Sequence, residues 1–182
     1  MLKPKTVSNH SVFTLLVLFL LAGCQSSSVP SLYREGLPGT ASWAVLPFVN
    51  YTESENVSDQ VEKILMVLLP SNGIDEPELY PEFLVTSANN VLTDAHKVQS
   101  GRQWAFQNGV SFAFTGTVNE WMFDDEGRPH VALSLTVMDV RSDETLWSIS
   151  GASEGLPGDD LFAVSRGLIN DLLRSLPVNR RL

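Results

Sequence analysis

Hydrophobic and polar residues alternate through residues 110–151, and two short polar stretches interrupt the alternation. Period-2 alternation between turn-forming segments is typical of β-strands that bury one face. The turns are residues 124–129 and 141–144, so the pattern predicts an antiparallel meander of three strands. The side chains expected on its buried face are Phe112, Phe114, Gly116 and Val118 in the first strand, and Val131, Leu133, Leu135 and Val137 in the second.

The segments before and after this meander carry apolar residues at helical spacing. Residues 58–69 carry apolar side chains at positions i, i+3, i+4 and i+7, and Ser58 is suited to cap their start. Further apolar residues widen the stripe beyond one face, so we expect this helix to be buried on two sides or to contact another subunit. The stripe consists of Val61, Ile64, Leu65 and Leu68, and the residues that widen it are Met66, Val67 and Leu69.

Two more helices are predicted at residues 87–107, with Gly101 as a candidate break, and at residues 160–176, with Asp160 near the start. Residues 43–49 read as a first strand, which Pro47 places at a sheet edge or at a bulge. A short strand is expected near residues 82–85. The order β-α-(β)-α-β-β-β-α predicts an α+β fold, in which helices pack on an antiparallel or mixed sheet of about four to five strands.

The N-terminal residues predict export and lipidation. Lys3 and Lys5 precede an apolar run, residues 12–22, that is too short to span a bilayer. The run ends in Leu21-Ala-Gly-Cys24, which resembles a bacterial lipobox and implies cleavage before Cys24 and acylation of that residue. The alternatives are an ordinary signal peptide or a short membrane anchor. Because Gln25 is not the aspartate that commonly retains lipoproteins at the inner membrane, we expect the periplasmic face of the outer membrane.

The sequence predicts three consecutive regions in the chain. Residues 1–23 are expected to be a lipoprotein signal peptide, and residues 24–42 the lipidated cysteine with a flexible tether rich in Ser, Pro and Gly. Residues 43–178 are expected to form a single periplasmic α+β domain, since this length and apolar content support one ordinary core.

The charge of the chain limits its partners. Without Lys3 and Lys5 the mature chain has 21 acidic residues against 10 basic ones, a net charge of −11. Such a chain is unsuited to nucleic acid, whose phosphates require Lys and Arg. It suits a cationic partner, although the charge is also explained by solubility alone. The single cysteine excludes an internal disulfide bond.

The acidic turn Asp124-Asp125-Glu126 is the most concentrated candidate site, and it has three interpretations. A catalytic carboxylate cluster would need a cleft that separates the pKa values of its members. A solvated turn is the simplest interpretation. A belt of charge contributed by several subunits is the third.

Other chemistry is poorly supported. Gly151-Ala-Ser153-Glu-Gly155 matches the G-x-S-x-G nucleophile motif, but no histidine follows Ser153 as the usual order of an esterase requires. His96 and His130 lie far apart and lack further ligands at metal-binding spacing. We therefore expect no enzyme activity, no metal and no cofactor. Trp121 and Trp147 are expected to pack on the sheet rather than to bind sugar.

With these residues in view, the chain resembles the PelC family, outer-membrane lipoproteins of the Pel exopolysaccharide export system. The resemblance covers most of residues 43–176 in order. It rests on Trp43-Ala-Val-Leu-Pro-Phe48, Thr115-Gly-Thr-Val-Asn-Glu-Trp121, the turn at residues 126–129, Met138-Asp-Val140, Leu146-Trp-Ser-Ile-Ser-Gly151 and the last helix. More distantly the pattern is similar to the α+β domain of the secretion lipoprotein CsgG and of the cell-wall synthase activator LpoB.

The PelC resemblance implies a non-enzymatic role. It implies a ring of twelve subunits whose electronegative pore guides a cationic polysaccharide toward an outer-membrane porin similar to PelB. Glu126 matches the acidic residue of the family's Gly-containing turn, so it is the first pore candidate, followed by Asp125 and Asp124. Where we expect the family to carry a tryptophan in the next loop, this chain has Leu156, the candidate for membrane contact.

Two alternatives remain open from the sequence. An LpoB-like lipoprotein would act as a monomer on a cell-wall synthase, and a secretion-accessory lipoprotein would serve another export system.

Overall fold

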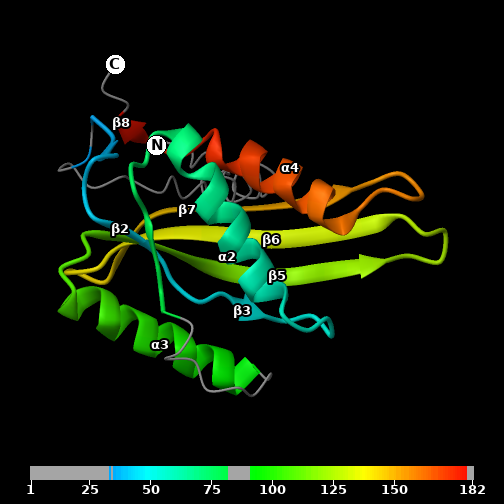
Figure 1. Ribbon diagram of the computed structural model, residues 1–182, viewed down its shortest axis with the longest axis horizontal. Coiled ribbons are helices and arrows are strands. Elements are labelled where there is room, and N and C mark those ends of the chain that lie inside the picture. The colour runs from blue at the N-terminus through cyan, green and yellow to red at the C-terminus, as the bar shows by residue number, and fades with distance from the viewer. Residues whose placement is uncertain (1–32, 34, 82–90, 180–182) are drawn as a thin grey trace, which may run out of the picture.

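The computed structural model describes Tyr33, residues 35–81 and residues 91–179, and it shows helices packed on both faces of a mixed sheet (Figure 1). The strand order is β4-β2-β5-β6-β7, and β3 also pairs with β5, so that the sheet has six strands. The strands are β2 (Trp43–Val45), β3 (Val49–Asn50), β4 (Glu78–Leu79), β5 (Phe112–Phe123), β6 (Pro129–Asp139) and β7 (Glu144–Glu154). The predicted α+β class is confirmed.

The three long strands form the predicted antiparallel meander. Phe114 pairs with Val137 in β6, and Leu135 pairs with Ile149 in β7. Alternate residues of β6 are buried from Val131 to Val137, as the period-2 pattern predicts. The alternation in β5 shifts at a bulge between Val118 and Glu120, after which Trp121 returns to the buried face.

Pro47 separates two strands that pair with the same partner. Val45 of β2 pairs with Phe114 of β5, and Val49 of β3 pairs with Thr117 of β5. The chain therefore advances four residues from Val45 to Val49 while β5 advances three. This extra residue is the predicted bulge, and the Thr115 hydroxyl donates to the Pro47 carbonyl oxygen at 2.9 Å. Since β4 covers the other side of β2, the alternative position at a sheet edge is wrong for β2.

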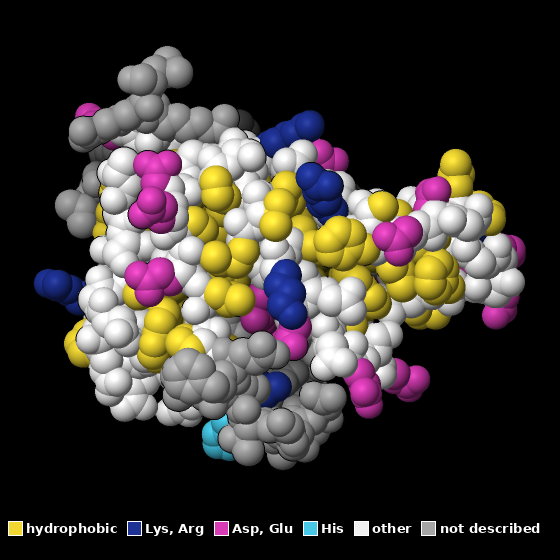
Figure 2. Space-filling model, viewed as in Figure 1, with side chains coloured by type: hydrophobic (Ala, Val, Ile, Leu, Met, Phe, Trp, Pro, Cys, Tyr) yellow, Lys and Arg dark blue, Asp and Glu magenta, His cyan; other side chains and the backbone are white. Residues whose placement is uncertain are grey.

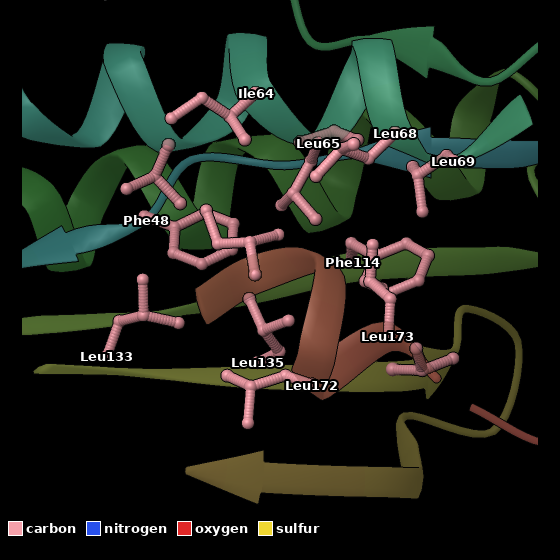
Figure 3. Packing of buried hydrophobic residues seen from close by; sticks show 14 of the residues in the cluster. Phe48, Ile64, Leu65, Leu68, Leu69, Phe114, Leu133, Leu135, Leu172 and Leu173 are labelled. Atoms are coloured by element: carbon pink, nitrogen blue, oxygen red, sulfur yellow. The ribbon is translucent and has the colours of Figure 1, made fainter. Parts of the chain in front are cut away.

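Two helices, α2 (Val57–Leu68) and α4 (Leu161–Leu173), cover one face of the sheet. Figure 3 shows Leu65 and Leu68 of α2 directed at Phe114, with Leu172 of α4 beside Leu135. Asp160 caps α4, because its carboxylate accepts a hydrogen bond from the Ala163 backbone N–H at 3.2 Å. Both helices therefore form where the sequence predicts them, but α2 begins at Val57 and its N-cap is Asn56, so the predicted Ser58 cap is wrong.

The helix α3 (Val91–Gln107) covers the opposite face near β2 and β5. It continues through Gly101 without a break. A Cβ atom there would lie 2.9 Å from Cδ of Pro47, so glycine allows the close approach of helix and strand. The second core consists of Ala44, Leu46, Tyr80, Ala105, Val110, Ala113, Met138 and Val140.

The wide apolar stripe of α2 is largely explained within the domain. Leu69, just past the helix, is fully buried, and Met66 packs against the core. Val67 is the one large apolar side chain of α2 that is exposed, at 65%. A 3₁₀ turn, η2 (Pro70–Asn72), follows, and Gly73 ends it at φ +89°.

The structure differs from the sequence prediction in where the folded domain begins and in its short strands. The predicted tether, residues 25–42, is wrong over the part that the structure describes, because β1 (Leu37–Pro38) pairs in parallel with β8 (Val178–Asn179) and Leu37 is buried. The strand β4 adds to the predicted count, whereas the strand expected near residues 82–85 lies outside the described residues. The signal peptide, Cys24 and most of the predicted tether also lie outside them.

Candidate functional site: an acidic tip

The candidate site is one end of the sheet, where the β5–β6 turn (residues 124–128) lies against the β7–α4 loop (residues 155–160). We call these two segments the tip. The turn closes through a hydrogen bond from Asp124 N to Arg128 O at 3.0 Å, and Gly127 adopts a left-handed φ of +75°. The loop joins the turn through bonds from Gly155 N to Pro129 O at 2.9 Å and from Gly158 N to Gly127 O at 3.3 Å.

Asp124 organises the turn from its centre. Its Oδ1 accepts the backbone N–H groups of Arg128 at 2.8 Å and Glu126 at 3.0 Å. Its Oδ2 accepts a hydrogen bond from Nε of Arg128 at 2.8 Å and lies 3.2 Å from Nε2 of His130. The bond from the Arg128 backbone, followed by the His130 and Arg128 side chains, holds the pKa of Asp124 well below its usual range. Asp124 therefore fixes the shape of the turn.

Arg128 links three carboxylates. Its guanidinium contacts Asp124 at 2.7 Å, Glu154 on β7 at 2.7 Å, and Glu126 within the turn. Its hydrogen bond to Asp124 is the first cause of a raised Arg128 pKa. The contact with Glu154 ties the turn to β7, so the tip is a defined structure rather than a loose hairpin end.

Two other carboxylates remain available to a ligand. The side chain of Glu126 is 68% exposed although it contacts Arg128. Asp125 is exposed, and within the described residues its side chain makes no hydrogen bond or ion pair. The three acidic residues that the sequence treats alike thus differ: Asp124 has a structural role, while Asp125 and Glu126 face solvent.

Hydrophobic side chains accompany this charge. Leu156 is 72% exposed, and its loop is fixed by a bond from Leu156 N to the Asp159 carboxylate at 2.7 Å. Met122 and Phe123 at the end of β5, and Phe162 at the start of α4, are also exposed. Figure 2 shows hydrophobic and acidic side chains together on the narrow end of the molecule.

The other sequence candidates do not form a site. Ser153 lies inside β7, paired with Val131, rather than on a strand–helix turn, and His130 is on the opposite face of the sheet. Within the described ranges, no three His, Cys, Asp or Glu side chains are placed to hold a metal ion. Trp121 is 5% exposed and Trp147 packs against the core, as predicted for sheet residues. No helix of the described chain is both long enough and apolar enough to cross a membrane.

Comparison with solved structures identifies the fold. The PelC dodecamer from Paraburkholderia phytofirmans matches with a TM-score of 0.65 and 23% identity, over 79% of this chain and 91% of that chain. The chain has the PelC fold. A variant of the same PelC matches with a TM-score of 0.64 and 23% identity, over 79% of this chain and 93% of that chain. Lipoprotein GNA1162 from Neisseria meningitidis matches with a TM-score of 0.51 and 20% identity, over 75% of this chain and 99% of that chain.

No protein-family model matches the sequence, and a comparison with curated protein sequences finds no match. The structural likeness therefore supports the predicted resemblance to PelC at the level of the fold.

Sequence reasoning missed the residues that support the tip. Arg128, His130 and Glu154 act only once the meander places the turn beside the end of β7. The pairing of β6 with β7 brings His130 opposite Glu154, and this register includes a shift between Val137 and Met138 that the sequence pattern does not predict. The sequence pattern also does not single out Glu62 of α2, whose partly buried carboxyl accepts a hydrogen bond from the Phe48 backbone N–H.

Proposed function

We propose that the protein is a non-enzymatic lipoprotein of the outer membrane, anchored on the periplasmic side through Cys24. In this proposal its copies form a closed ring, as the PelC dodecamer does, and their tips guide a cationic polysaccharide toward an outer-membrane porin of the PelB kind. The observation that carries the proposal is the tip itself: Asp125 and Glu126 are presented to solvent by a turn that Asp124 and Arg128 hold rigid.

The charge of the tip explains why assembly matters. The tip, residues 124–128 and 155–160, contains five carboxylates and one guanidinium, which leaves four negative charges uncompensated. A single exposed carboxylate acts weakly beyond the Debye length of about 8 Å at physiological salt. Repeating the tip around a ring forms a belt of charge whose field concentrates a polycation. Each contact stays weak, so the polymer is not trapped.

The acidic pair provides the direct test. Asp125→Asn combined with Glu126→Gln is expected to lower the affinity of the assembled protein for a cationic polysaccharide such as chitosan several-fold at low salt. Both side chains are exposed, so the fold and the mass of the oligomer should not change. Added salt should weaken binding by the wild-type protein and have little effect on the variant. Binding is measured by titration, after light scattering has confirmed the assembly.

The matched control removes the same charge elsewhere. Asp75→Asn combined with Glu76→Gln changes two exposed acids in the loop between η2 and β4, away from the tip, and should bind as the wild type does. Equal loss in both double variants would mean that net charge, and not the tip, is responsible. A protein that stays monomeric at all concentrations would instead favour the LpoB-like alternative.

Leu156 is proposed to touch the lipid surface. Leu156→Asp is expected to reduce binding of the lipid-free protein to phospholipid vesicles about tenfold, because burying a leucine contributes about 1.5–3 kcal/mol. Folding should be unaffected, since the side chain is exposed. Val67→Asp, an exposed apolar position at the far end of α2, is the control. Vesicle sedimentation measures both, and equal binding by the Leu156 variant and the wild type would contradict the contact.

A further inference from the structure

The chain between the proposed lipid anchor and the domain is attached to the domain earlier than its composition suggests. We call Tyr33 and residues 35–42 the strap. Leu37 is 1% exposed, and its backbone N–H donates to the Pro177 carbonyl oxygen. Farther along, Nε1 of Trp43 donates to Pro38 O at 3.0 Å, and Asp75 N donates to Gly39 O at 3.0 Å. The strap is therefore part of the folded domain.

Tyr33 is its first attachment point. The Tyr33 hydroxyl donates to Oδ2 of Asp139 at 2.8 Å, and its ring packs edge-on against Phe112 with centroids 5.5 Å apart. The other oxygen of Asp139 accepts the backbone N–H groups of Arg141 and Ser142 at 2.9 Å each. One carboxylate thus joins the strap to the β6–β7 turn.

This attachment shortens the length of chain between the proposed anchor and the folded domain. Cys24 and Tyr33 are nine residues apart, so their separation cannot exceed about 30 Å. From Cys24 to Trp43, where the sequence predicts the domain to begin, the limit would be about 65 Å. The strand β5 has 12 residues and is about 40 Å long. Phe112, under Tyr33, is at one end of it, and Phe123, beside the tip, is at the other.

We infer that the strap is a latch that faces the lipid surface and holds the Tyr33–Asp139 end of the sheet within about 30 Å of it. The inference rests on the proposed lipidation of Cys24. A domain standing upright with its tip on the membrane would place Tyr33 about 40 Å away, beyond the reach of the tether. Anchor and tip can approach the same membrane only when the sheet is inclined to it.

The height of the domain can be measured by energy transfer. The lipidated protein is placed in phosphatidylethanolamine–phosphatidylglycerol vesicles that contain a dye-labelled lipid. A donor dye is attached through Arg141→Cys at the strap end or through Asp125→Cys at the tip. Because Cys24 is the one native cysteine and carries the lipid, each variant is labelled at one position.

Two changes release the domain in different ways. Inserting about ten Gly and Ser residues before Tyr33 doubles the reach and leaves the latch intact. Combining Tyr33→Ala with Leu37→Ala removes the latch and keeps the number of residues between Cys24 and Trp43 unchanged. Both are expected to cause a clear loss of transfer from position 141. Unchanged transfer after the insertion, which carries no risk of unfolding, would overturn the inference, and so would unchanged transfer in a folded double-alanine variant.

A third variant separates the latch from the anchor. Cys24→Ser protein should not bind the vesicles through its N-terminus. If it binds and transfers energy as the wild type does, the proposed lipid anchoring fails, whatever the latch does. If it is released while the insertion and double-alanine variants match the wild type, the anchor stands and the latch is wrong.

Discussion

Replacing Gly116 with alanine is expected to destabilise the domain by about 3 kcal/mol or more, the upper end of the range for overpacked cores. Gly116 lies in β5 opposite Leu135, and the ring of Phe48 occupies the space beside it. A Cβ atom there would lie 2.0 Å from the backbone oxygen of Ser134 and 2.6 Å from Cε1 of Phe48. Neither contact is tolerable, and the first cannot be relieved by turning a side chain.

Thermal unfolding followed by circular dichroism measures the effect. A loss of this size should lower the Tm by about 10 °C in a domain of this length. Gly167→Ala is the matched control, because it lies in α4 with no atom within 4 Å of the added methyl group. Alanine is the better helix former, so this variant should gain about 0.5–1 kcal/mol. A Gly116 variant as stable as the wild type would mean that β5 and β6 can separate without cost.

The fold could be predicted where hydrophobic periodicity was strong and local. The meander, α2 and α4 each show a clear period, and each forms where expected. The strands β1, β4 and β8 have two residues each, which is too few to show a period. Their position depends on tertiary partners, and this is why the composition of the strap predicts a flexible tether instead.

The candidate site was only partly predictable for a related reason. The acidic turn is visible as a run of three acidic residues, but nothing in the run distinguishes Asp124 from its neighbours. The difference arises because Asp124 accepts hydrogen bonds from the turn backbone, while Asp125 is directed to solvent. Likewise, Asp139 gains its partner from Tyr33, which is 106 residues away in the sequence. Burial raises the Asp139 pKa, but bonds from Ser142 N and the Tyr33 hydroxyl outweigh it and lower the pKa overall.

Glu62 shows what a helical pattern cannot predict. It lies beside the apolar stripe of α2, and its Oε1 accepts the backbone N–H of Phe48 at 3.0 Å, just after the Pro47 bulge. Burial raises the pKa of Glu62 to about 8, against the opposing effect of that hydrogen bond. At neutral pH the carboxyl is therefore mostly protonated. An acid that is uncharged in the native state makes stability depend on pH.

The sign of this dependence follows from the two pKa values. An unfolded glutamate ionises near 4.3, whereas Glu62 in the native state ionises at about 8. Between these values the native state binds more protons, so stability falls as the pH rises. The slope from one such group is at most about 1.4 kcal/mol per pH unit. The contribution is fully present below the unfolded pKa and is lost by about pH 8.

Glu62→Gln should remove this dependence. Glutamine keeps an oxygen that can accept the Phe48 N–H but cannot ionise, so the variant should be more stable than the wild type at pH 8–9 and nearly equal to it at pH 5. Denaturant unfolding from pH 5 to 9 measures the difference, in a range above the lowered pKa values of Asp124 and Asp139. Glu53→Gln, an exposed residue between β3 and α2, is the control and should parallel the wild type. A wild-type curve that is flat over this range and overlies the glutamine variant would show that Glu62 is ionised and solvated in the native protein.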